Sequence, residues 1–289
     1  MGAPPIGEPD WNSRENRVTD ALRLRLVELV ETVADGVFGD TAVVSDKGDD
    51  GIDLVTSIDY LMQQRLVAEL PALLPGSEVV GEEDFAGIDM SRRHVWLVDP
   101  LDGTVNFVAG LPFYGVAVVL LEDGIPVLAA IRDVPRSVTY SARKGGGAMR
   151  DGRPLVVADN KARLGALSSG LVRNLATHAP AVLADLMTGW KLRNLGSQAL
   201  QLCHAAEGSL KFVASYEARS WDDLAGSLIA REAGLVYGHY SGNARPPADA
   251  PQMSLCTRAE LFDELAGQLA RSQPPSVSQA GAPGASAPR

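Results

Sequence analysis

Hydrophobic positions recur at helical spacing in two stretches near the N-terminus. Between residues 14 and 38, apolar side chains return every three or four positions, which predicts a long helix with one buried face. A second helix is expected to begin at an N-cap formed by Thr56 or Ser57 and to end at Pro71 and the run Leu74-Pro75-Gly76. Each helix therefore has an apolar face that must pack against another layer.

From residue 78 onward the pattern is that of short β-strands separated by turns. The β-rich runs are 78–80, 95–98, 114–121, 127–131 and 137–141. Their hairpin-like spacing after residue 113 predicts antiparallel pairing within one sheet. Further along, helical patterns alternate with apolar segments; the helical patterns cover 197–207 and 222–233, and the apolar segments cover 165–168, 211–213 and 235–237. We therefore predict two lobes that meet near residue 150, an antiparallel-sheet α+β half followed by an α/β half.

Composition narrows the range of partners. The chain has 289 residues, with 26 Lys and Arg against 36 Asp and Glu, which gives a formal net charge of −10. Because nucleic acids and anionic membranes attract basic surfaces, and the sequence contains no basic run, we expect neither as a partner. The longest apolar stretch, Val116–Leu121, is too short to span a membrane, and the first residues lack a signal-peptide pattern. With only Cys203 and Cys256 available, no disulfide framework is expected, and we expect a cytoplasmic protein.

The ends of the chain differ in composition from its middle. Residues 1–13 are expected to be flexible, and residues 272–289 are almost entirely Ser, Gln, Pro, Gly and Ala, which predicts a disordered tail. Between them we expect an N-terminal lobe over residues 14–150 and a C-terminal lobe over residues 151–271.

Acidic residues gather at three places that follow apolar runs. These are the strings Gly81-Glu82-Glu83-Asp84, Asp99-Pro100-Leu101-Asp102-Gly103-Thr104 and, after Trp221, the pair Asp222-Asp223. Carboxylates at strand ends and helix starts are how proteins assemble oxygen-rich sites for Mg²⁺. A single Asp-Gly pair usually marks a solvated turn. The combination of three acidic strings instead favours a site that holds several metal ions and binds a phosphate.

In these strings the chain resembles the inositol monophosphatase family of Mg²⁺-dependent, lithium-sensitive phosphatases. The matching strings follow the family's order over about residues 14–265 and are Asp53-Leu54-Val55-Thr56-Ser57-Ile58-Asp59, Gly81–Asp84, Asp99–Thr104 with Asn106-Phe107, Ala142–Ala148 and Trp221–Gly226. The resemblance implies an α+β fold, a layered αβαβα sandwich of the sugar-phosphatase type. It also implies a homodimer that hydrolyses small-molecule phosphate monoesters with two or three Mg²⁺ ions.

The resemblance assigns metal ligands at five positions. It implies that Glu82, Asp99 and the carbonyl of Leu101 hold the first Mg²⁺. Asp99, Asp102 and Asp222 would hold the second, and Glu82 with water molecules a weaker third. These oxygen atoms are of the kind that Mg²⁺ prefers.

Catalytic and phosphate-binding roles follow from the same resemblance. Thr104, hydrogen-bonded to Asp59, would orient the attacking water and, together with Glu82, help to deprotonate it. The backbone N–H groups of Gly103 and Thr104, next to Asp102, would bind the phosphate. The implied reaction is direct in-line hydrolysis with no covalent enzyme intermediate.

The resemblance also places four further residues around the substrate. A mobile loop that contains Lys47 and Asp53 would close over the metal ions. Ser197 and Gln198 would lie beside the alcohol part of the substrate.

The substrate itself is less strongly indicated. Family members that act on inositol phosphates usually carry a glutamate seven residues before the Trp-Asp aspartate, and this chain has Ser215 there. Either Glu217, two residues later, keeps the polyol-binding role, or the enzyme recognises another group. Arg219 could then bind a second phosphate or a carboxylate.

Three hypotheses for the function remain open. Inositol monophosphate is the default substrate. The same chemistry could act on adenosine 3′,5′-bisphosphate, histidinol phosphate, fructose 1,6-bisphosphate or a nucleotide of a specialised pathway. A third possibility is a non-catalytic binding or regulatory protein that keeps the fold.

Overall fold

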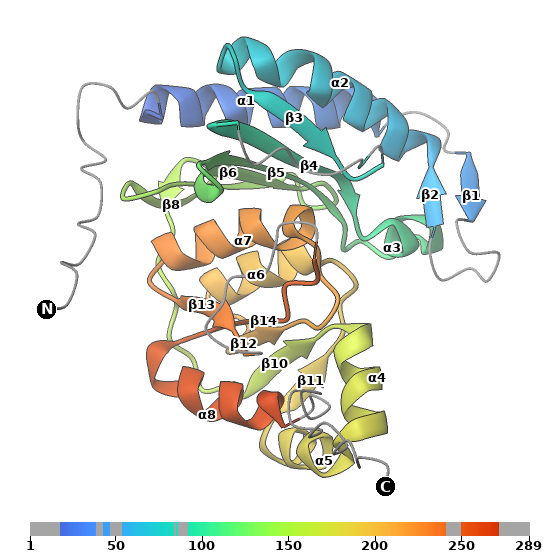
Figure 1. The fold of residues 1–289 in the computed structure, drawn as a ribbon, viewed down its shortest axis with the longest axis vertical. Helices are drawn as coiled ribbons and strands as arrows, with labels where there is room; N and C mark the ends of the chain where they lie inside the picture. The colour runs from blue at the N-terminus through green and yellow to red at the C-terminus, as the bar shows by residue number, and fades with distance from the viewer. Residues whose placement is uncertain are drawn as a thin grey trace, which may run out of the picture.

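The computed structural model describes residues 18–38, 43–46, 54–83, 85, 92–240 and 250–271. These residues form five layers in the order helix, sheet, helix, sheet, helix (Figure 1). The predicted fold class, a layered αβαβα sandwich, is confirmed. The predicted flexible segment 1–13, the predicted disordered tail 272–289, and the loop residues Lys47 and Asp53 lie outside the described residues.

Helices form the first, third and fifth layers. Their bounds are α1 (Asp20–Val37), α2 (Ser57–Leu73), α3 (Thr104–Ala109), α4 (Ser169–His178), α5 (Pro180–Gly189), α6 (Gln198–Ala206), α7 (Ser220–Glu232) and α8 (Ala259–Ala270). The pair α1 and α2 forms the first layer, α6 and α7 the third, and α4, α5 and α8 the fifth (Figure 1).

The second layer is a seven-stranded sheet with the order β3-β4-β5-β6-β7-β8-β9. Its strands are β3 (Glu78–Gly81), β4 (His94–Asp102), β5 (Gly115–Glu122), β6 (Ile125–Asp133), β7 (Val138–Arg143), β8 (Gly147–Arg150) and β9 (Arg153–Pro154). Neighbouring strands are antiparallel, as predicted, except for the parallel pair β3 and β4. Because those two strands run the same way, Glu82 and Asp99 emerge at one edge of the sheet. The sheet also continues through β9, past the boundary expected at residue 150.

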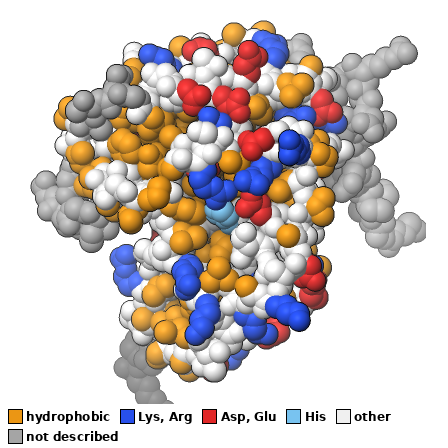
Figure 2. All heavy atoms as spheres, turned by 180° about the vertical axis from the view of Figure 1, so that it is seen from behind, with side chains coloured by type: hydrophobic (Ala, Val, Ile, Leu, Met, Phe, Trp, Pro, Cys, Tyr) orange, Lys and Arg blue, Asp and Glu red, His pale blue; other side chains and the backbone are white. Residues whose placement is uncertain are grey.

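The fourth layer is a mixed five-stranded sheet with the order β11-β10-β12-β14-β13. Its strands are β10 (Leu164–Leu167), β11 (Lys191–Arg193), β12 (Phe212–Ala214), β13 (Val236–His239) and β14 (Ser254–Thr257), and a separate pair is formed by β1 (Val44–Asp46) and β2 (Leu54–Thr56). Strand β10 runs parallel to β11 and β12, whereas β14 runs antiparallel to both of its neighbours. On the face shown in Figure 2, Lys and Arg side chains lie among hydrophobic and acidic ones in both lobes.

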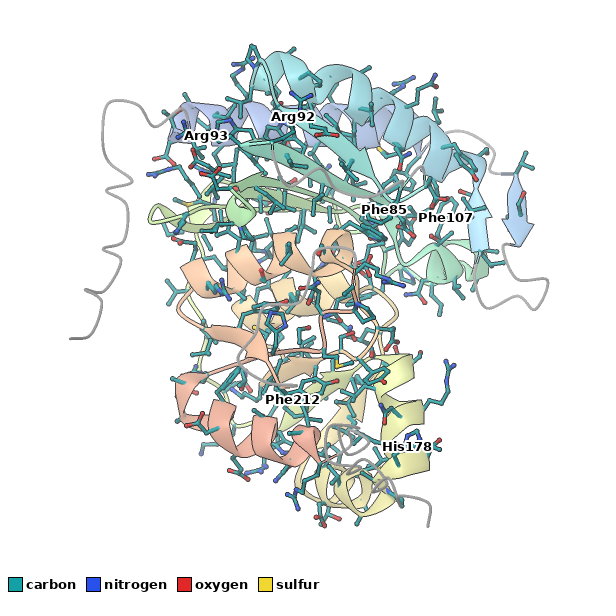
Figure 3. The ribbon with its side chains drawn as sticks, viewed as in Figure 1. Phe85, Arg92, Arg93, Phe107, His178 and Phe212 are labelled. Atoms are coloured by element: carbon teal, nitrogen blue, oxygen red, sulfur yellow. The ribbon has the colours of Figure 1, made fainter. Side chains whose placement is uncertain are left out.

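Three hydrophobic cores separate the layers. In β4, Trp96 and Val98 face α1 and α2, whereas Val95 and Leu97 face α6 and α7. This period of two lets one buried strand serve both cores. The third core lies between the five-stranded sheet and the outer helices and includes Phe212, which Figure 3 labels in the lower lobe.

Two predicted helix boundaries differ in part from the structure, although α2 ends directly before the run Leu74-Pro75-Gly76, as predicted. The first helix begins at Asp20, after residue 14, where the hydroxyl of Thr19 accepts a hydrogen bond from the backbone N–H of Leu22. Pro71 lies inside α2, which continues to Leu73. A proline this close to a C-terminus removes one backbone hydrogen bond without breaking the turns before it. Among the described residues, no helix combines the length and the apolar character that crossing a bilayer requires.

Candidate active site

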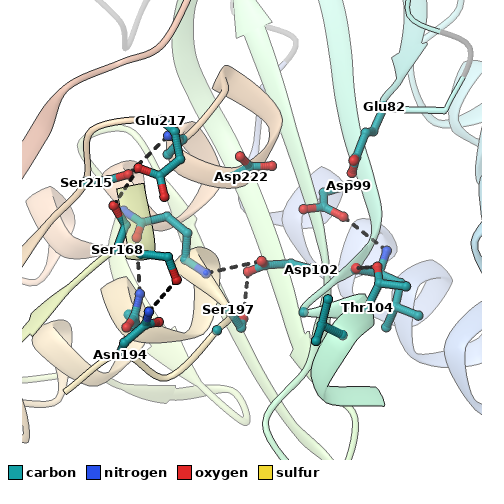
Figure 4. Close-up of a pocket in the computed structure, with 18 of the residues that line it drawn as sticks. Glu82, Asp99, Asp102, Thr104, Ser168, Asn194, Ser197, Ser215, Glu217 and Asp222 are labelled. Carbon is teal, nitrogen blue, oxygen red and sulfur yellow. Dashed lines mark hydrogen bonds between the residues drawn. The ribbon is translucent and has the colours of Figure 1, made fainter. Parts of the chain in front are cut away.

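Three carboxylates from two lobes face one small volume. Glu82 follows β3, Asp99 lies near the end of β4, and Asp222 is in the first turn of α7. One oxygen atom from each lies within 4.8 Å of the others (Figure 4). The register between β4 and β5 shifts between Asp99 and Asp102, so the end of β4 leaves the regular ladder at this point. This is the type of oxygen-rich site that hard divalent cations occupy.

The local charge is strongly unfavourable without a cation. Asp99 is only 2% exposed, and its carboxylate accepts a hydrogen bond of 3.1 Å from the backbone N–H of Leu101. Burial, followed by repulsion from Glu82 and Asp102, raises the pKa of Asp99 well above its ordinary value. Burial and the charge of Glu82 likewise raise the pKa of Asp222 well above its ordinary value. Among the described residues that line this cavity, none is Lys or Arg.

Asp102 binds the second lobe as well as facing the cavity. Its carboxylate accepts hydrogen bonds from the hydroxyl of Ser197 at 2.6 Å and from the backbone N–H groups of Gln198 at 3.1 Å and Ala199 at 2.6 Å. Burial raises the pKa of Asp102 to about 6, and the Ser197 hydroxyl opposes that shift. Asp102 is not part of the group of three carboxylates within 4.8 Å of one another among the described residues.

Thr104 and Asp59 contact each other, as the resemblance implied. The hydroxyl of Thr104 lies 3.2 Å from the carboxylate of Asp59 and 2.9 Å from the carbonyl of Leu101. It has one proton and two possible acceptors. The other carboxylate oxygen of Asp59 accepts from the backbone N–H and hydroxyl of Thr56, which completes a capping box at the start of α2. Asp59 is therefore held rigidly where Thr104 can reach it.

Gly103 lets β4 turn into α3 beside these groups. Its φ of 97° lies in the left-handed region, which favours glycine. A Cβ atom there would meet the carbonyl oxygen of Phe113 at 3.0 Å. Any other residue would therefore strain the turn that places Thr104 beside Asp59.

The carboxylates and Thr104 line a cavity of about 270 Å³ between the two lobes. The second lobe also contributes polar side chains that the sequence pattern did not single out, namely Ser168, Ser169, Asn194 and Gln201. Ser168 is the N-cap of α4 and accepts from the backbone N–H of Leu171 at 3.2 Å. The string Ser168-Ser169-Gly170, which begins at the end of the predicted apolar segment 165–168, was the one signal that could have located this wall.

Comparison with known proteins identifies the group to which this arrangement belongs. The family model described as "Inositol monophosphatase family" matches residues 16–274. The chain belongs to this family.

Curated and solved relatives agree with the match. The chain is 34% identical over 207 residues to a protein of Xylella fastidiosa named "Nus factor SuhB", with 70% of this chain and 73% of that protein covered. It is 35% identical over 194 residues to the "Inositol-1-monophosphatase" of Mycobacterium leprae, with 63% and 67% covered. The structure of an IMPase from Thermotoga maritima superposes with a TM-score of 0.73 at 24% identity, over 88% of this chain and 98% of that one, and supports the fold.

As a member of the inositol monophosphatase family, the chain is an enzyme that hydrolyses phosphate monoesters. The structure brings Glu82, Asp99, Leu101, Asp102, Gly103, Thr104 and Asp222 to one cavity, and Asp59 contacts it through Thr104. Phe85, which Figure 3 labels, packs against Trp221 with a distance of 4.8 Å between ring centroids, which joins the segment after β3 to the start of α7. The contact lies close in sequence to Glu82 and directly before Asp222, so it links the two segments that carry these carboxylates.

Four residues were predicted to contact the part of the substrate beyond the hydrolysed phosphate, and the structure places them differently. They are Ser197, Gln198, Glu217 and Arg219. Ser197 and Gln198 line the cavity, but the hydroxyl of Ser197 is already bound to Asp102 and the side-chain amide of Gln198 donates to Asp223 at 2.9 Å. Glu217 lines the cavity, whereas Arg219 is exposed and is not among the described lining residues.

Proposed function

We propose that the protein is a Mg²⁺-dependent phosphatase of a small-molecule phosphate monoester, with inositol monophosphate as the reference substrate. The observation that carries the proposal is the group formed by Glu82, Asp99 and Asp222, whose carboxylate oxygens meet within 4.8 Å at the bottom of a cavity between the lobes. Three acidic groups held so close, two of them with raised pKa values, fit a divalent cation bound between them.

We propose that the Leu101 carbonyl and Asp102 complete the ligand set for two or three ions. The Leu101 carbonyl faces the hydroxyl of Thr104 at 2.9 Å, and both residues line the cavity. Bound Mg²⁺ would supply Lewis-acid chemistry, which lowers the pKa of a bound water and offsets the charge of the phosphate. Carboxylates that repel one another in the bare protein would then attract an anionic substrate through the cations they hold.

The protein's own groups would orient the attacking water and the phosphate. In this role the Thr104 hydroxyl would donate its hydrogen bond to Asp59, which leaves the lone pairs of Thr104 Oγ1 free to accept a hydrogen bond from a water molecule in the cavity. Glu82, on the same cavity wall, would take the proton that the water loses. The backbone N–H groups of Gly103 and Thr104 would donate to the phosphate oxygens. The proposed reaction is in-line displacement without a covalent enzyme intermediate.

A second candidate is favoured by the geometry at Ser215 and Glu217. Ser215 is buried, and its hydroxyl accepts from the backbone N–H of Ala218 at 3.1 Å. Both carboxylate oxygens of Glu217 accept hydrogen bonds, from the Ser168 hydroxyl at 2.8 Å and the Gly170 backbone N–H at 2.6 Å. Ser215 offers no carboxylate to the hydroxyl groups of inositol, and the two hydrogen bonds to Glu217 use two of its acceptor sites and hold it toward Ser168 and Gly170, which favours a phosphate ester with a different alcohol part.

The test is a phosphate-release assay of the purified chain with Mg²⁺, without Mg²⁺ and with EDTA. The substrates are inositol monophosphate, adenosine 3′,5′-bisphosphate, histidinol phosphate and fructose 1,6-bisphosphate. We expect release that requires Mg²⁺ from at least one of them. Release that is unchanged by EDTA would contradict metal dependence, and no release from any substrate would favour a non-catalytic role. Sedimentation of the same sample tests the proposed homodimer.

A further inference from the structure

A second cavity adjoins the catalytic one behind Glu217. It measures about 460 Å³ and lies between one face of α4 and the loop that follows β12. Glu217 lines both cavities, and the backbone N–H of Gly170, which lines the second, is bound to the Glu217 carboxylate. The catalytic cavity alone, at about 270 Å³, lies below the usual range of about 300–1,000 Å³ for small-molecule sites. Together the two cavities provide room for a longer ester.

The second cavity is lined by an exposed arginine that pairs with no described residue. Arg173 lines the cavity on α4, and its guanidinium has no hydrogen bond or ion pair with any described residue. Among the described residues that line the two cavities, Arg173 is the one Lys or Arg. A free guanidinium presents a fork of N–H donors that matches a phosphate or carboxylate group.

The acid between the two cavities is already compensated. Glu217 accepts from the Ser168 hydroxyl and the Gly170 backbone N–H, both at the start of α4, where the helix dipole favours a negative charge. An anion beside Arg173 therefore meets a carboxylate whose charge is partly offset by these donors. Asn174 and His178 line the cavity with Arg173, and His178 lies on α4 at the outer side of the lower lobe (Figure 3).

His178 adds a polar ring nitrogen to the same wall. Its Nδ1 lies 3.2 Å from both the backbone carbonyl and the side-chain oxygen of Asn174. Because both neighbours are acceptors, Nδ1 carries the proton, and Nε2 stays available to a ligand.

We propose that the substrate of this enzyme carries a second anionic group, a phosphate or a carboxylate, and that Arg173 binds it in the cavity behind Glu217. This inference rests on the proposed phosphatase function and specifies its substrate class. The hydrolysed phosphate lies against Glu82, Asp99 and Asp222, and a sugar-sized spacer passes Glu217. Arg173 thus replaces Arg219, which the sequence pattern had suggested, because both side chains are exposed but only Arg173 is among the described residues that line either cavity.

The experiment compares matched pairs of esters that differ only in the second anionic group. The phosphate arm uses adenosine 3′,5′-bisphosphate against adenosine 3′-monophosphate and fructose 1,6-bisphosphate against fructose 1-phosphate. The carboxylate arm uses 2-phosphoglycerate against glycerol 2-phosphate. Each ester is assayed by phosphate release with saturating Mg²⁺. We expect the wild-type kcat/KM to be higher for the doubly anionic member of at least one pair. Whether that pair belongs to the phosphate arm or to the carboxylate arm identifies the second anionic group.

Arg173→Met keeps the length of the side chain and removes its charge. We expect it to lower the ratio of the two kcat/KM values in the preferred pair by about 10-fold to 100-fold, mainly through KM, since a contact outside the reacting atoms contributes to substrate and transition state alike. Arg173→Lys should restore part of the ratio. The matched control is Arg65→Met, an exposed arginine on α2 in the other lobe, which should leave both values unchanged.

The outcomes separate this inference from the proposed function. A wild-type enzyme that shows no preference in any pair, or an Arg173→Met variant that lowers both members equally, overturns the second-anion site while leaving the phosphatase intact. Absence of Mg²⁺-dependent release from every ester contradicts the phosphatase function itself.

Discussion

The hydroxyl of Ser197 donates a hydrogen bond of 2.6 Å to the carboxylate of Asp102, which joins the start of α6 in one lobe to the end of β4 in the other. The same hydroxyl accepts from the backbone N–H of Leu200 at 3.3 Å and so caps α6. One side chain therefore ends a helix and fixes a proposed metal ligand. The position of Asp102 in the cavity depends on how the two lobes pack.

Ser197→Ala should remove both roles, and two measurements distinguish their effects. Loss of the cap is expected to lower the free energy of unfolding by about 1 kcal/mol. Asp102 keeps the hydrogen bonds from two backbone N–H groups but loses the one from the Ser197 hydroxyl. We expect kcat to fall by about 10-fold because the carboxylate is less firmly held. Thermal unfolding and phosphate release measure the two effects.

Thr19→Ala is the matched control, because Thr19 caps α1 far from the cavity with the same kind of hydrogen bond. It should lose comparable stability and no activity. If both alanine variants lose the same share of kcat, the link between Ser197 and Asp102 has no functional role.

Asp99→Asn removes one charge from the crowded carboxylate group. We expect kcat/KM to fall by at least about 100-fold, since a cation site loses a charged ligand. The variant should fold and, without metal, unfold at a higher temperature than the wild type near neutral pH, because repulsion with Glu82 and Asp102 is relieved.

The exposed turn residue Asp123 provides the matched control for that substitution. Asp123→Asn removes the same charge outside the cavity and should change neither property. Undiminished hydrolysis by the Asp99→Asn variant would contradict the proposed mechanism.

The stability of the metal-free protein should depend on pH through Asp99 and Asp222. Their pKa values in the folded state are raised above the ordinary value of 3.8 by burial and by neighbouring carboxylates. Between 3.8 and the raised values, the folded state binds more protons than the unfolded state, so stability falls as pH rises. Added Mg²⁺ should therefore raise the unfolding temperature more at about pH 8 than at about pH 5.5.

Calorimetry of the EDTA-treated protein at several pH values, with and without Mg²⁺, measures this dependence. Other groups also titrate, so the informative quantity is the difference between the wild type and Asp99→Asn. That difference should grow as pH rises. A Mg²⁺-induced shift that is larger at the acidic end would show that the raised pKa values do not govern cation binding.

Much of this fold follows from local patterns because its elements have strong periodicity. The apolar face of α2, the N-cap Thr56 and the strands around Val118 could be located without tertiary information. Strand β14 and the outer helices α4, α5 and α8 were not predicted. Their boundaries depend on contacts with the five-stranded sheet, such as the packing of Leu171 and Leu265 in the third core.

The proposed metal ligands could be predicted for a related reason. Glu82 and Asp99 follow apolar runs, and Asp222 follows Trp221 at a helix start, so the local sequence predicts that all three lie near the ends of elements. The wall formed by Ser169 and Asn194 could not be predicted in this way. These two residues meet because β11, which precedes Asn194, pairs with β10, which precedes α4, and that pairing is a tertiary contact.

Thr104 offers a test of the water-orienting role. Thr104→Val removes the hydroxyl with little change in volume, whereas Thr104→Ser keeps the hydroxyl and removes a methyl group. We expect kcat to fall by at least about 100-fold for valine and by less than about 10-fold for serine, because only the hydroxyl contacts Asp59. Equal losses in the two variants would indicate that the side chain acts through packing alone. Steady-state phosphate release, with KM and kcat determined separately, distinguishes these results.

The last prediction concerns the buried carboxylate behind the cavity. Asp223 is fully buried and accepts hydrogen bonds from the Tyr237 hydroxyl at 2.6 Å and the Gln198 amide at 2.9 Å. Burial raises the pKa of Asp223, so these donors are needed to keep its charge in place. Tyr237→Phe should lower the free energy of unfolding by about 1–3 kcal/mol, because a buried charged acceptor loses a donor. Chemical denaturation measures this loss.

The exposed Tyr60 supplies the comparison, since Tyr60→Phe removes the same hydroxyl from a side chain that is 51% exposed. We expect no loss of stability there. Tyr237→Phe should also lower kcat by a smaller factor than Ser197→Ala, because it reaches Asp102 only indirectly, through Asp223 and the Gln198 backbone N–H. Equal stability of the two phenylalanine variants would mean that the Asp223 carboxylate is protonated in the folded enzyme and needs no second donor.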